Sequence, residues 1–421
     1  MWHTFRISYA PHTLLAPINC VRCVENNPTF RKSTSDFPRG GQMAATVRCL
    51  LQVSHKMLIL AEIISDMLKY MSILSLLGLV ACGNGFKNLT VDQFESETAS
   101  GAVAVVDVRT PEEYAEGHLR DASNCDWKSE DFLQQMERAY PKETPIAVYC
   151  RSGKRSADAS KALSKAGYKV CNMLGGYLAW TEAGKPTIKY DVETFFTESG
   201  KPVAITLIKH GSLAISYDGK SIQIDPVSGL GKPTDYAVEF PKADIIFVTH
   251  EHRDHFDPEA IAGLTKLKYD LIVTSLITNM RCEELLGHAN GDEVVDDVMA
   301  NGDKMELKGI TVEAVPAYNY SEGRTQFHPK GRDNGFVLTL DGLRIYIAGD
   351  TEDIPEMAEL KDIDIAFLPV NQPYTMTVDQ CVNAAKVIAP KVLIPYHFSN
   401  TDLSTLPDRL PGINVLLRHM E

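Results

Sequence analysis

The sequence has little positive charge for its length. It holds 42 Lys and Arg against 55 Asp and Glu in 421 residues. Because the whole chain carries −13 and residues 1–81 carry +4, residues 82–421 carry −17. This acidic segment would repel a phosphate backbone, so nucleic acid is not an expected partner. Ordinary charged and apolar fractions argue against wholesale disorder, and the length predicts two or three domains.

Closely spaced cysteine pairs are also scarce. Cys20 and Cys23 form the one close pair among nine cysteines. No second pair follows at the spacing of a zinc ribbon. The sequence therefore favours neither a disulfide framework nor a cysteine-ligated zinc site.

The N-terminal region lacks an apolar run long enough to span a membrane, which takes about 20 residues. Residues 71–81 are apolar, follow a basic segment and precede Cys82, which is the layout of a secretory signal. The last four residues, Leu-Val-Ala-Cys, resemble a bacterial lipobox and imply acylation of Cys82. An N-terminal helix packed on the body is the alternative.

We therefore expect residues 67–82 to be a lipoprotein signal peptide. Residues 1–66 are expected to be an unstructured extension or a segment upstream of the true start. The expected location is the bacterial cell envelope, outside the cytoplasm, with the membrane as a partner through the lipid anchor.

Residues 83–186 have the pattern of an α/β sandwich. The runs 103–108 and 146–149 are apolar and β-branched, as in buried parallel strands. Helical stretches at 132–139 and 156–166 alternate with them.

The second of these strands ends at Cys150, and a basic loop then leads into a helix. Backbone N–H groups and the helix N-terminus would point at the sulfur, lower its pKa and hold an anion. The expected anion-binding residues are Arg151, Ser152, Gly153, Lys154 and Arg155.

Three segments of this region, Asp107–Leu119, Cys150–Ser156 and Gly175–Trp180, resemble those of rhodanese domains in order and spacing. The resemblance implies that Cys150 is a nucleophile that carries a persulfide from a sulfane-sulfur donor. Four residues separate Cys150 from Arg155, whereas related cysteine phosphatases have five, so sulfur is favoured over phosphate. A non-catalytic rhodanese-like module is the alternative.

A linker is expected at 187–201 and a second domain at 202–421. Strands are predicted at 203–209, 213–217, 221–224 and 245–248, and the last leads into His-Glu-His-Arg-Asp-His. On an extended segment His250, His252 and Asp254 would face one way, with His255 reaching over from the loop. Imidazoles with carboxylates suit zinc, and two such ions can share a hydroxide.

This second region resembles the metallo-β-lactamase fold, and within it the branch of ascorbate-6-phosphate-lactonase-like and phospholipase-D-type hydrolases. Five segments carry the resemblance, around residues 225, 250–255, 315–319, 348–351 and 394–397. It implies an αββα domain that follows the rhodanese α/β sandwich. It also implies His250 and His252 on one metal, Asp254, His255 and His397 on the other, Asp350 as a bridge, and Asp225 orienting a ligand.

One position departs from the family pattern. Where many relatives have a third histidine for the first metal, this chain has Asn319, and His328 is the nearest substitute. We expect His328 to be a ligand; without it, a mononuclear enzyme or another metal is favoured. His210 is interpreted as a structural or surface histidine, and Glu352 is expected to cap the helix after Asp350.

The sequence thus predicts a hydrolase that acts on a lactone or phosphoester of a small molecule. Two divalent ions are expected, zinc first, with manganese and iron as alternatives. Cys150 and Asp254 are the expected catalytic residues. One rival is sulfur oxidation of the persulfide dioxygenase type with a single iron. The other is a lipoprotein that senses sulfur or metal without turnover.

Overall fold

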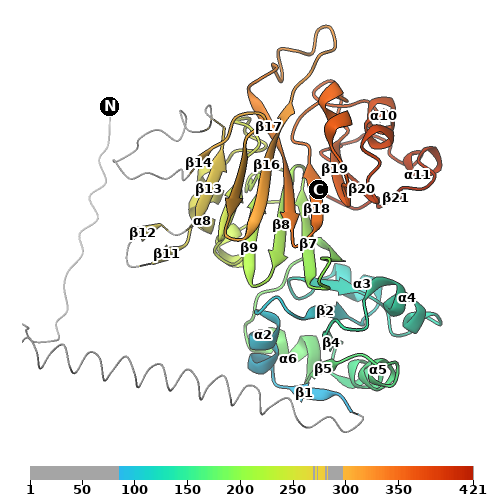
Figure 1. The fold of residues 1–421 in the computed structure, drawn as a ribbon. Coiled ribbons are helices and arrows are strands. Elements are labelled where there is room, and N and C mark those ends of the chain that lie inside the picture. The colour runs from blue at the N-terminus through green and yellow to red at the C-terminus, as the bar shows by residue number, and fades with distance from the viewer. Residues whose placement is uncertain (1–84, 269–270, 273, 280–281, 283–296, 421) are drawn as a thin grey trace, which may run out of the picture. The chain divides into compact units, whose positions relative to one another are not determined.

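The computed structural model describes residues 85–420, apart from 269–270, 273, 280–281 and 283–296 (Figure 1). The predicted signal peptide and Cys82 lie outside the described residues. Within the described residues, every helix is too short or too polar to cross a bilayer.

The first domain is a parallel five-stranded sheet with the strand order β1-β5-β4-β2-β3. Val106 and Val148 pack on one face with helices α4 and α5, and Val105 and Tyr149 pack on the other with α2 and α6. Because both faces are buried, these strands have continuous apolar sequences, and the predicted sandwich is confirmed. The elements are β1 (Lys87–Leu89), α2 (Val91–Thr98), β2 (Ala104–Asp107), α3 (Pro111–Ala115), β3 (Ala122–Asn124), α4 (Phe132–Ala139), β4 (Ile146–Tyr149), α5 (Lys154–Lys165), β5 (Val170–Met173) and α6 (Gly176–Glu182).

The second domain has two seven-stranded sheets, ordered β14-β13-β10-β9-β8-β7-β6 and β15-β16-β17-β18-β19-β20-β21. The elements of the first sheet and its helices are β6 (Asp191–Phe196), β7 (Pro202–Lys209), β8 (Ser212–Tyr217), β9 (Lys220–Ile224), α7 (Tyr236–Glu239), β10 (Ile245–Phe247), α8 (Pro258–Leu264), β13 (Ser275–Thr278) and β14 (Asp297–Val298). A separate hairpin pairs β11 (Leu267–Lys268) with β12 (Leu271–Ile272).

The elements of the second sheet and its helices are β15 (Lys304–Leu307), β16 (Ile310–Ala317), β17 (Asp333–Leu340), β18 (Leu343–Ile347), η1 (Pro355–Glu359), β19 (Ile365–Pro369), α10 (Val378–Ile388), β20 (Val392–Tyr396), α11 (Leu406–Arg409) and β21 (Asn414–Val415). Side chains of both sheets, such as Phe247 and Phe336, form one shared core. Helices α7 and α8 cover the outer face of the first sheet, and α10 and α11 that of the second. The αββα prediction is confirmed.

The segment 187–201 is more than a linker, which corrects the prediction. Its residues Asp191–Phe196 form β6, the edge strand of the first sheet, paired antiparallel with β7. Only Val192 of this strand is buried. An edge strand has one neighbour and a half-solvated face, so it lacks the continuous apolar run that identified the central strands.

Candidate metal centre

The histidine- and aspartate-bearing segments meet where strands end. Asp225 directly follows β9, and His397 directly follows β20. His250 and Asp350 each lie three residues beyond the ends of β10 and β18. His328 comes from the loop between β16 and β17. Strands β9 and β10 run parallel, as do β18, β19 and β20, so their carboxyl ends bring these loops together.

The side chains form three overlapping groups whose nitrogen and carboxylate oxygen atoms lie within 4.8 Å of one another. The groups are His250, His252 and His328; His250, His255 and Asp350; and His210, Asp254, His255 and His397. Two of the histidines belong to more than one group, so the cluster is continuous. All seven residues predicted from the sequence as metal ligands are members.

The chain turns after His252, which corrects the predicted extended segment. The N–H of His255 and that of Phe256 both donate to the carbonyl of His252, at 2.9 and 2.8 Å. The turn sends Asp254 away from His250 and His252 and toward His397, at the other end of the cluster. A tight turn, rather than alternation along a strand, therefore divides the motif between two neighbouring groups.

Asp350 lies at the centre. Its Oδ2 is 3.3 Å from Nε2 of His328 and 3.2 Å from Nε2 of His397, and its Oδ1 is 3.3 Å from Nε2 of His255. Burial alone would raise the pKa of Asp350, but His397 and His255 hold it well below its usual range. A buried carboxylate that faces histidines of both ends has the position of a bridging ligand.

The outer sides of the histidines are held by hydrogen bonds. Nδ1 of His255 lies 2.7 Å from Asp225, and Nδ1 of His328 lies 3.0 Å from Asp333. The Thr249 hydroxyl donates to Asp225 at 2.7 Å and lies 3.0 Å from Nδ1 of His250. Such contacts fix the ring orientation and leave the opposite nitrogen free for a cation. Asp225 therefore lies on the outer side of His255 and contacts Thr249 beside His250.

His328 and Asn319 have different positions. Nε2 of His328 faces Asp350 inside the cluster. Burial would lower the pKa of His328, but Asp333 and Asp350 raise it to about 9. The Asn319 amide instead donates to the carbonyl of Tyr374 at 2.6 Å, and its backbone N–H donates to the carbonyl of His328 at 2.8 Å. Asn319 thus supports the loop that brings His328 into the cluster.

His210 is the residue that sequence reasoning missed. It lies between β7 and β8, with Nε2 3.0 Å from Oδ2 of Asp254 and its ring 3.6 Å from that of His397. The packing of the first sheet on the second brings it there, and the backbone N–H of His397, after β20, donates to the carbonyl of His210 at 3.0 Å. No short motif signals this contact.

Glu352 corrects a second expectation. The helix that follows Asp350 is the 3₁₀ turn η1, and it has no side-chain cap. Glu352 is fully buried and accepts the N–H groups of Tyr320 and Ser321, both at 2.8 Å, and forms an ion pair with Arg324. Its carboxylate fastens the loop that carries His328 rather than a helix end.

The donor set fits divalent cations. Nε2 of His255, Nε2 of His397 and Oδ1 of Asp350 are buried and make no well-aligned hydrogen bond among the described residues, although histidine and carboxylate face each other at 3.2–3.3 Å. Unpaired buried polar atoms are costly, at about 1–3 kcal/mol each, unless something binds them. Burial also lowers the pKa of His250 well below its usual range, so that its ring is neutral and able to ligate.

The Cys150 loop has the predicted local geometry. Cys150 is 1% exposed at the end of β4, and its Sγ accepts the N–H of Gly153 at 3.2 Å and the hydroxyl of Ser156 at 3.4 Å. Helix α5 begins at Lys154, so its N-terminus faces the sulfur. Burial raises the pKa of Cys125 and Cys171 to about 12, which keeps these two residues as thiols.

Arg155 has a partner that the motif alone did not predict. Its two terminal nitrogens donate to the two carboxylate oxygens of Glu113, each at 2.7 Å. Glu113 also completes the capping box of α3 with Thr110. The bidentate pair orients Arg155 beside the loop and offsets its charge.

Comparisons with known proteins agree with this architecture. Residues 204–397 match the family model of the beta-lactamase superfamily domain, and residues 90–183 match that of the rhodanese-like domain. A UPF0173 metal-dependent hydrolase of Pyrococcus abyssi is 31% identical over 208 residues, which cover 47% of this chain and 85% of the relative. One from Ligilactobacillus salivarius is 33% identical over 208 residues, 46% of this chain and 84% of the relative.

Among solved structures, a protein from Parabacteroides distasonis classed as a metal-dependent hydrolase is 51% identical. The match covers 55% of this chain and 100% of that one, with a TM-score of 0.50.

Proposed function

Because the chain belongs to the UPF0173 family of metal-dependent hydrolases, we propose that its second domain hydrolyses a lactone or phosphoester of a small molecule with two bound divalent ions, zinc first. The supporting observation is that buried atoms of His255, His397 and Asp350 make no well-aligned hydrogen bond and point into one cluster of metal-binding side chains. The match of residues 204–397 to the family model of the beta-lactamase superfamily domain also supports the proposal.

The proposed ligands divide between two ions. His250, His252 and His328 would hold the first, and Asp254, His255 and His397 the second, with Asp350 between them. When bound, such ions polarise the bond to be cleaved and lower the pKa of a water molecule. Zinc is favoured because imidazole and carboxylate donors suit it, with manganese and iron as alternatives.

The protein's own residues supply orientation and proton handling. The Asp254 side chain is 35% exposed, whereas that of Asp350 is 3% exposed, so Asp254 is the carboxylate that a substrate can reach. His210 holds its Oδ2 at 3.0 Å. We assign Asp254 the transfer of a proton during hydrolysis, at a carboxylate oxygen kept in place by His210.

Metal analysis tests this proposal. The purified protein should contain two metal ions per chain, and His252→Ala or His328→Ala should lower the content toward one and abolish hydrolysis of phosphodiester and lactone substrates. His419→Ala, which changes an exposed histidine, is the matched control and should behave as wild type. Wild-type protein that holds two ions yet hydrolyses neither substrate class would contradict the proposal and favour a sensor.

The rival reaction is persulfide oxidation with one iron. We disfavour it because histidine and aspartate donors lie at both ends of the cluster, which supports two ions rather than one. One iron per chain, with oxygen consumption on a low-molecular-weight persulfide, would establish the rival and exclude hydrolysis.

For the first domain we propose sulfur transfer by Cys150. Its thiolate attacks the outer sulfur of a donor such as thiosulfate, the S–S bond of the donor breaks, and sulfite leaves with the bonding electron pair. The persulfide then passes its outer sulfur to an acceptor such as cyanide and regenerates the thiolate. The Gly153 N–H and the Ser156 hydroxyl stabilise sulfur anions at this position.

Cys150→Ser should abolish thiosulfate:cyanide sulfur transfer and leave hydrolysis unchanged. The control is Cys171→Ser, at a buried cysteine elsewhere in the same sheet. Sulfur transfer that persists in Cys150→Ser would exclude Cys150 as the nucleophile.

We also propose that a lipid on Cys82 anchors the protein to the bacterial envelope, outside the cytoplasm. The support is the sequence pattern alone, an apolar run that ends in Leu-Val-Ala-Cys. Metabolic labelling with a fatty-acid analogue should mark the wild-type protein and not Cys82→Ser. Equal labelling of both, or of neither, would contradict the anchor.

A further inference from the structure

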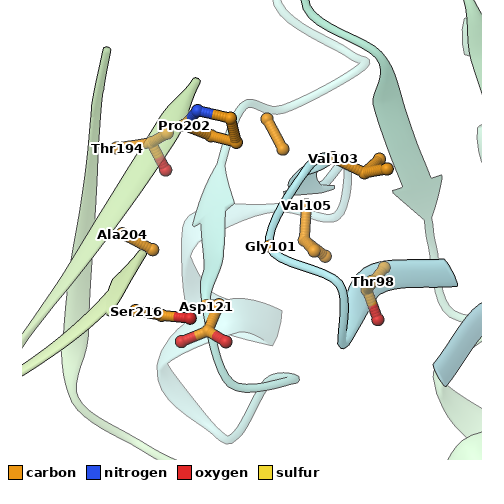
Figure 2. Close-up of a pocket in the computed structure, with 10 residues that line it drawn as sticks. Thr98, Gly101, Val103, Val105, Asp121, Thr194, Pro202, Ala204 and Ser216 are labelled. Atoms are coloured by element: carbon orange, nitrogen blue, oxygen red, sulfur yellow. The ribbon is translucent and has the colours of Figure 1, made fainter. Parts of the chain in front are cut away.

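A second cavity lies away from the metal cluster, between the two domains. Its volume is about 210 Å³. Arg120 and Asp121 of the first domain line one side, and Lys220, Gln223 and Lys242 of the second domain line the other. Beside it, a smaller cleft follows the same boundary, and Figure 2 shows the Asp121 carboxylate facing the Ser216 hydroxyl there.

Gln223 is the first sign that the cavity takes a ligand. It is 0% exposed, and neither its Nε2 nor its Oε1 has a hydrogen-bond partner in the described part of the chain. Both atoms belong to a side chain that lines the cavity. A buried amide donor and acceptor that both lack partners destabilise the folded protein. A partner that presents an acceptor beside a donor would satisfy both.

The surrounding charge indicates the rest of the ligand. Four cationic side chains line the cavity against two carboxylates. Lys266 is paired with Asp244 at 3.0 Å. Among the described residues, the Lys242 ammonium donates to the neutral carbonyl of Gly263. Arg120 lies 3.7 Å from Asp121, and Lys220 lies 3.4 Å from Asp218. Lys242 is therefore the lining cation without an ion pair among the described residues, which favours an anion beside it.

The cavity also has an apolar wall, formed by Ala214 and Phe240, which belong to the core cluster beneath helices α7 and α8. Such a wall with a few placed polar groups is typical of a small-molecule site.

From these observations we propose that the cavity binds a small organic anion with an amide-type edge. The edge pairs with the Gln223 carboxamide, and the negative charge lies near Lys242 and Arg120. Because the lining comes from both domains, the ligand would hold them together. Gln223 also lies on β9, two residues before Asp225, so a bound ligand would contact the strand that leads to the metal cluster.

Calorimetric titration of the full chain tests the proposal with three probes that share a uracil-type ring edge. Uridine 5′-monophosphate adds a phosphate, orotate adds a carboxylate, and uridine has no charge. At least one anion should bind about tenfold or more tightly than uridine, equivalent to about 1.4 kcal/mol. Comparison of the two anions identifies which acidic group the cavity prefers.

Two variants locate the binding. Gln223→Met removes the amide at similar volume, and Lys242→Ala removes an exposed charge; each should weaken the anion about tenfold. Lys391→Ala, at an exposed lysine far along the chain, should bind as wild type. Thermal unfolding checks that Gln223→Met folds. If this variant does not fold, the affinity of Lys242→Ala for the anion tests the proposal.

Failure of every probe at about 1 mM, or anion binding that neither variant weakens, would overturn the proposal. A crystal structure with water alone on Gln223 in the presence of the anions would overturn it as well. None of these outcomes depends on metal loading, so they are separate from the tests of hydrolysis.

Discussion

Asp225 holds His255 from the side that faces away from the cluster. The carboxylate Oδ2 of Asp225 lies 2.7 Å from Nδ1 of His255, and Nε2 of the same ring points to Asp350. Both side chains are fully buried. Burial alone would lower the pKa of His255, but Asp350 and Asp225 raise it well above its usual range. Asp225 therefore fixes the ring in place, with Nε2 as the nitrogen that faces the cluster.

Asp225→Asn should weaken metal affinity by about 10- to 100-fold, because the amide cannot accept the Nδ1 proton with the same strength. Competition with a chelator measures the affinity. Asp379→Asn, an exposed position on α10, is the control. Unchanged affinity in Asp225→Asn would show that Asp225 does not orient His255.

Gly211→Ala should displace the His255 ring by steric contact alone. A Cβ at this position would lie 2.6 Å from Cε1 of His255, so the ring or the β7–β8 turn must shift. We expect a loss of bound metal with little loss of secondary structure, measured by elemental analysis and circular dichroism. Gly229→Ala is the control, since its Cβ meets no atom within 4 Å. Full metal content in Gly211→Ala would refute this argument.

Glu352→Ala should lower the free energy of unfolding by about 3–5 kcal/mol, the range for a broken buried ion pair. The change leaves two backbone N–H groups without their acceptor and removes the carboxylate that neutralises Arg324, which keeps only neutral acceptors such as Gln372 and Ser321. The loop with His328 should loosen, so metal content should fall as well. Thermal unfolding gives the stability, and the exposed Glu359→Ala is the control. A loss below about 1 kcal/mol would contradict the assigned role.

The Glu113–Arg155 pair predicts a pH dependence of stability. The hydrogen bonds from Arg155 lower the pKa of Glu113 from 4.5 to about 2. A depressed carboxyl pKa stabilises the folded state above the unfolded pKa, and that contribution is lost as the pH falls through the folded pKa. The melting temperature of Glu113→Gln should thus lie below that of wild type above pH 5, and the gap should close between about pH 4.5 and pH 2. A gap independent of pH would exclude the ion pair as its cause.

Much of the fold could be predicted because central strands are buried on both faces. The runs at 146–149 and 203–209 are continuous and apolar, and they match β4 and β7 to within one residue. The metal-site motif was equally informative, since it lies in six consecutive residues after a strand. Strand β6 was not predicted because its sequence shows neither a continuous apolar run nor a clear alternation of apolar and polar residues.

The missed contacts share one physical cause. His210 with Asp254, and Arg155 with Glu113, each join residues more than 40 positions apart. Local periodicity carries no information about such pairs, because they depend on which strands become neighbours. The sequence predicted His328 as a ligand only because it is the histidine nearest to Asn319. The contacts that hold its loop come from Glu352, which accepts the N–H of Tyr320.

Strand β6 decides how the two domains can be separated experimentally. If 187–201 were a simple linker, the chain could be cut at residue 201. The second domain would then lose β6, the strand Asp191–Phe196 that pairs with β7. The fully buried β7 would then present its unpaired backbone to other molecules, and self-association would follow. A cut before Asp191 keeps β6 paired with β7, so a soluble second domain free of the rhodanese-like domain should be obtained only from the longer fragment.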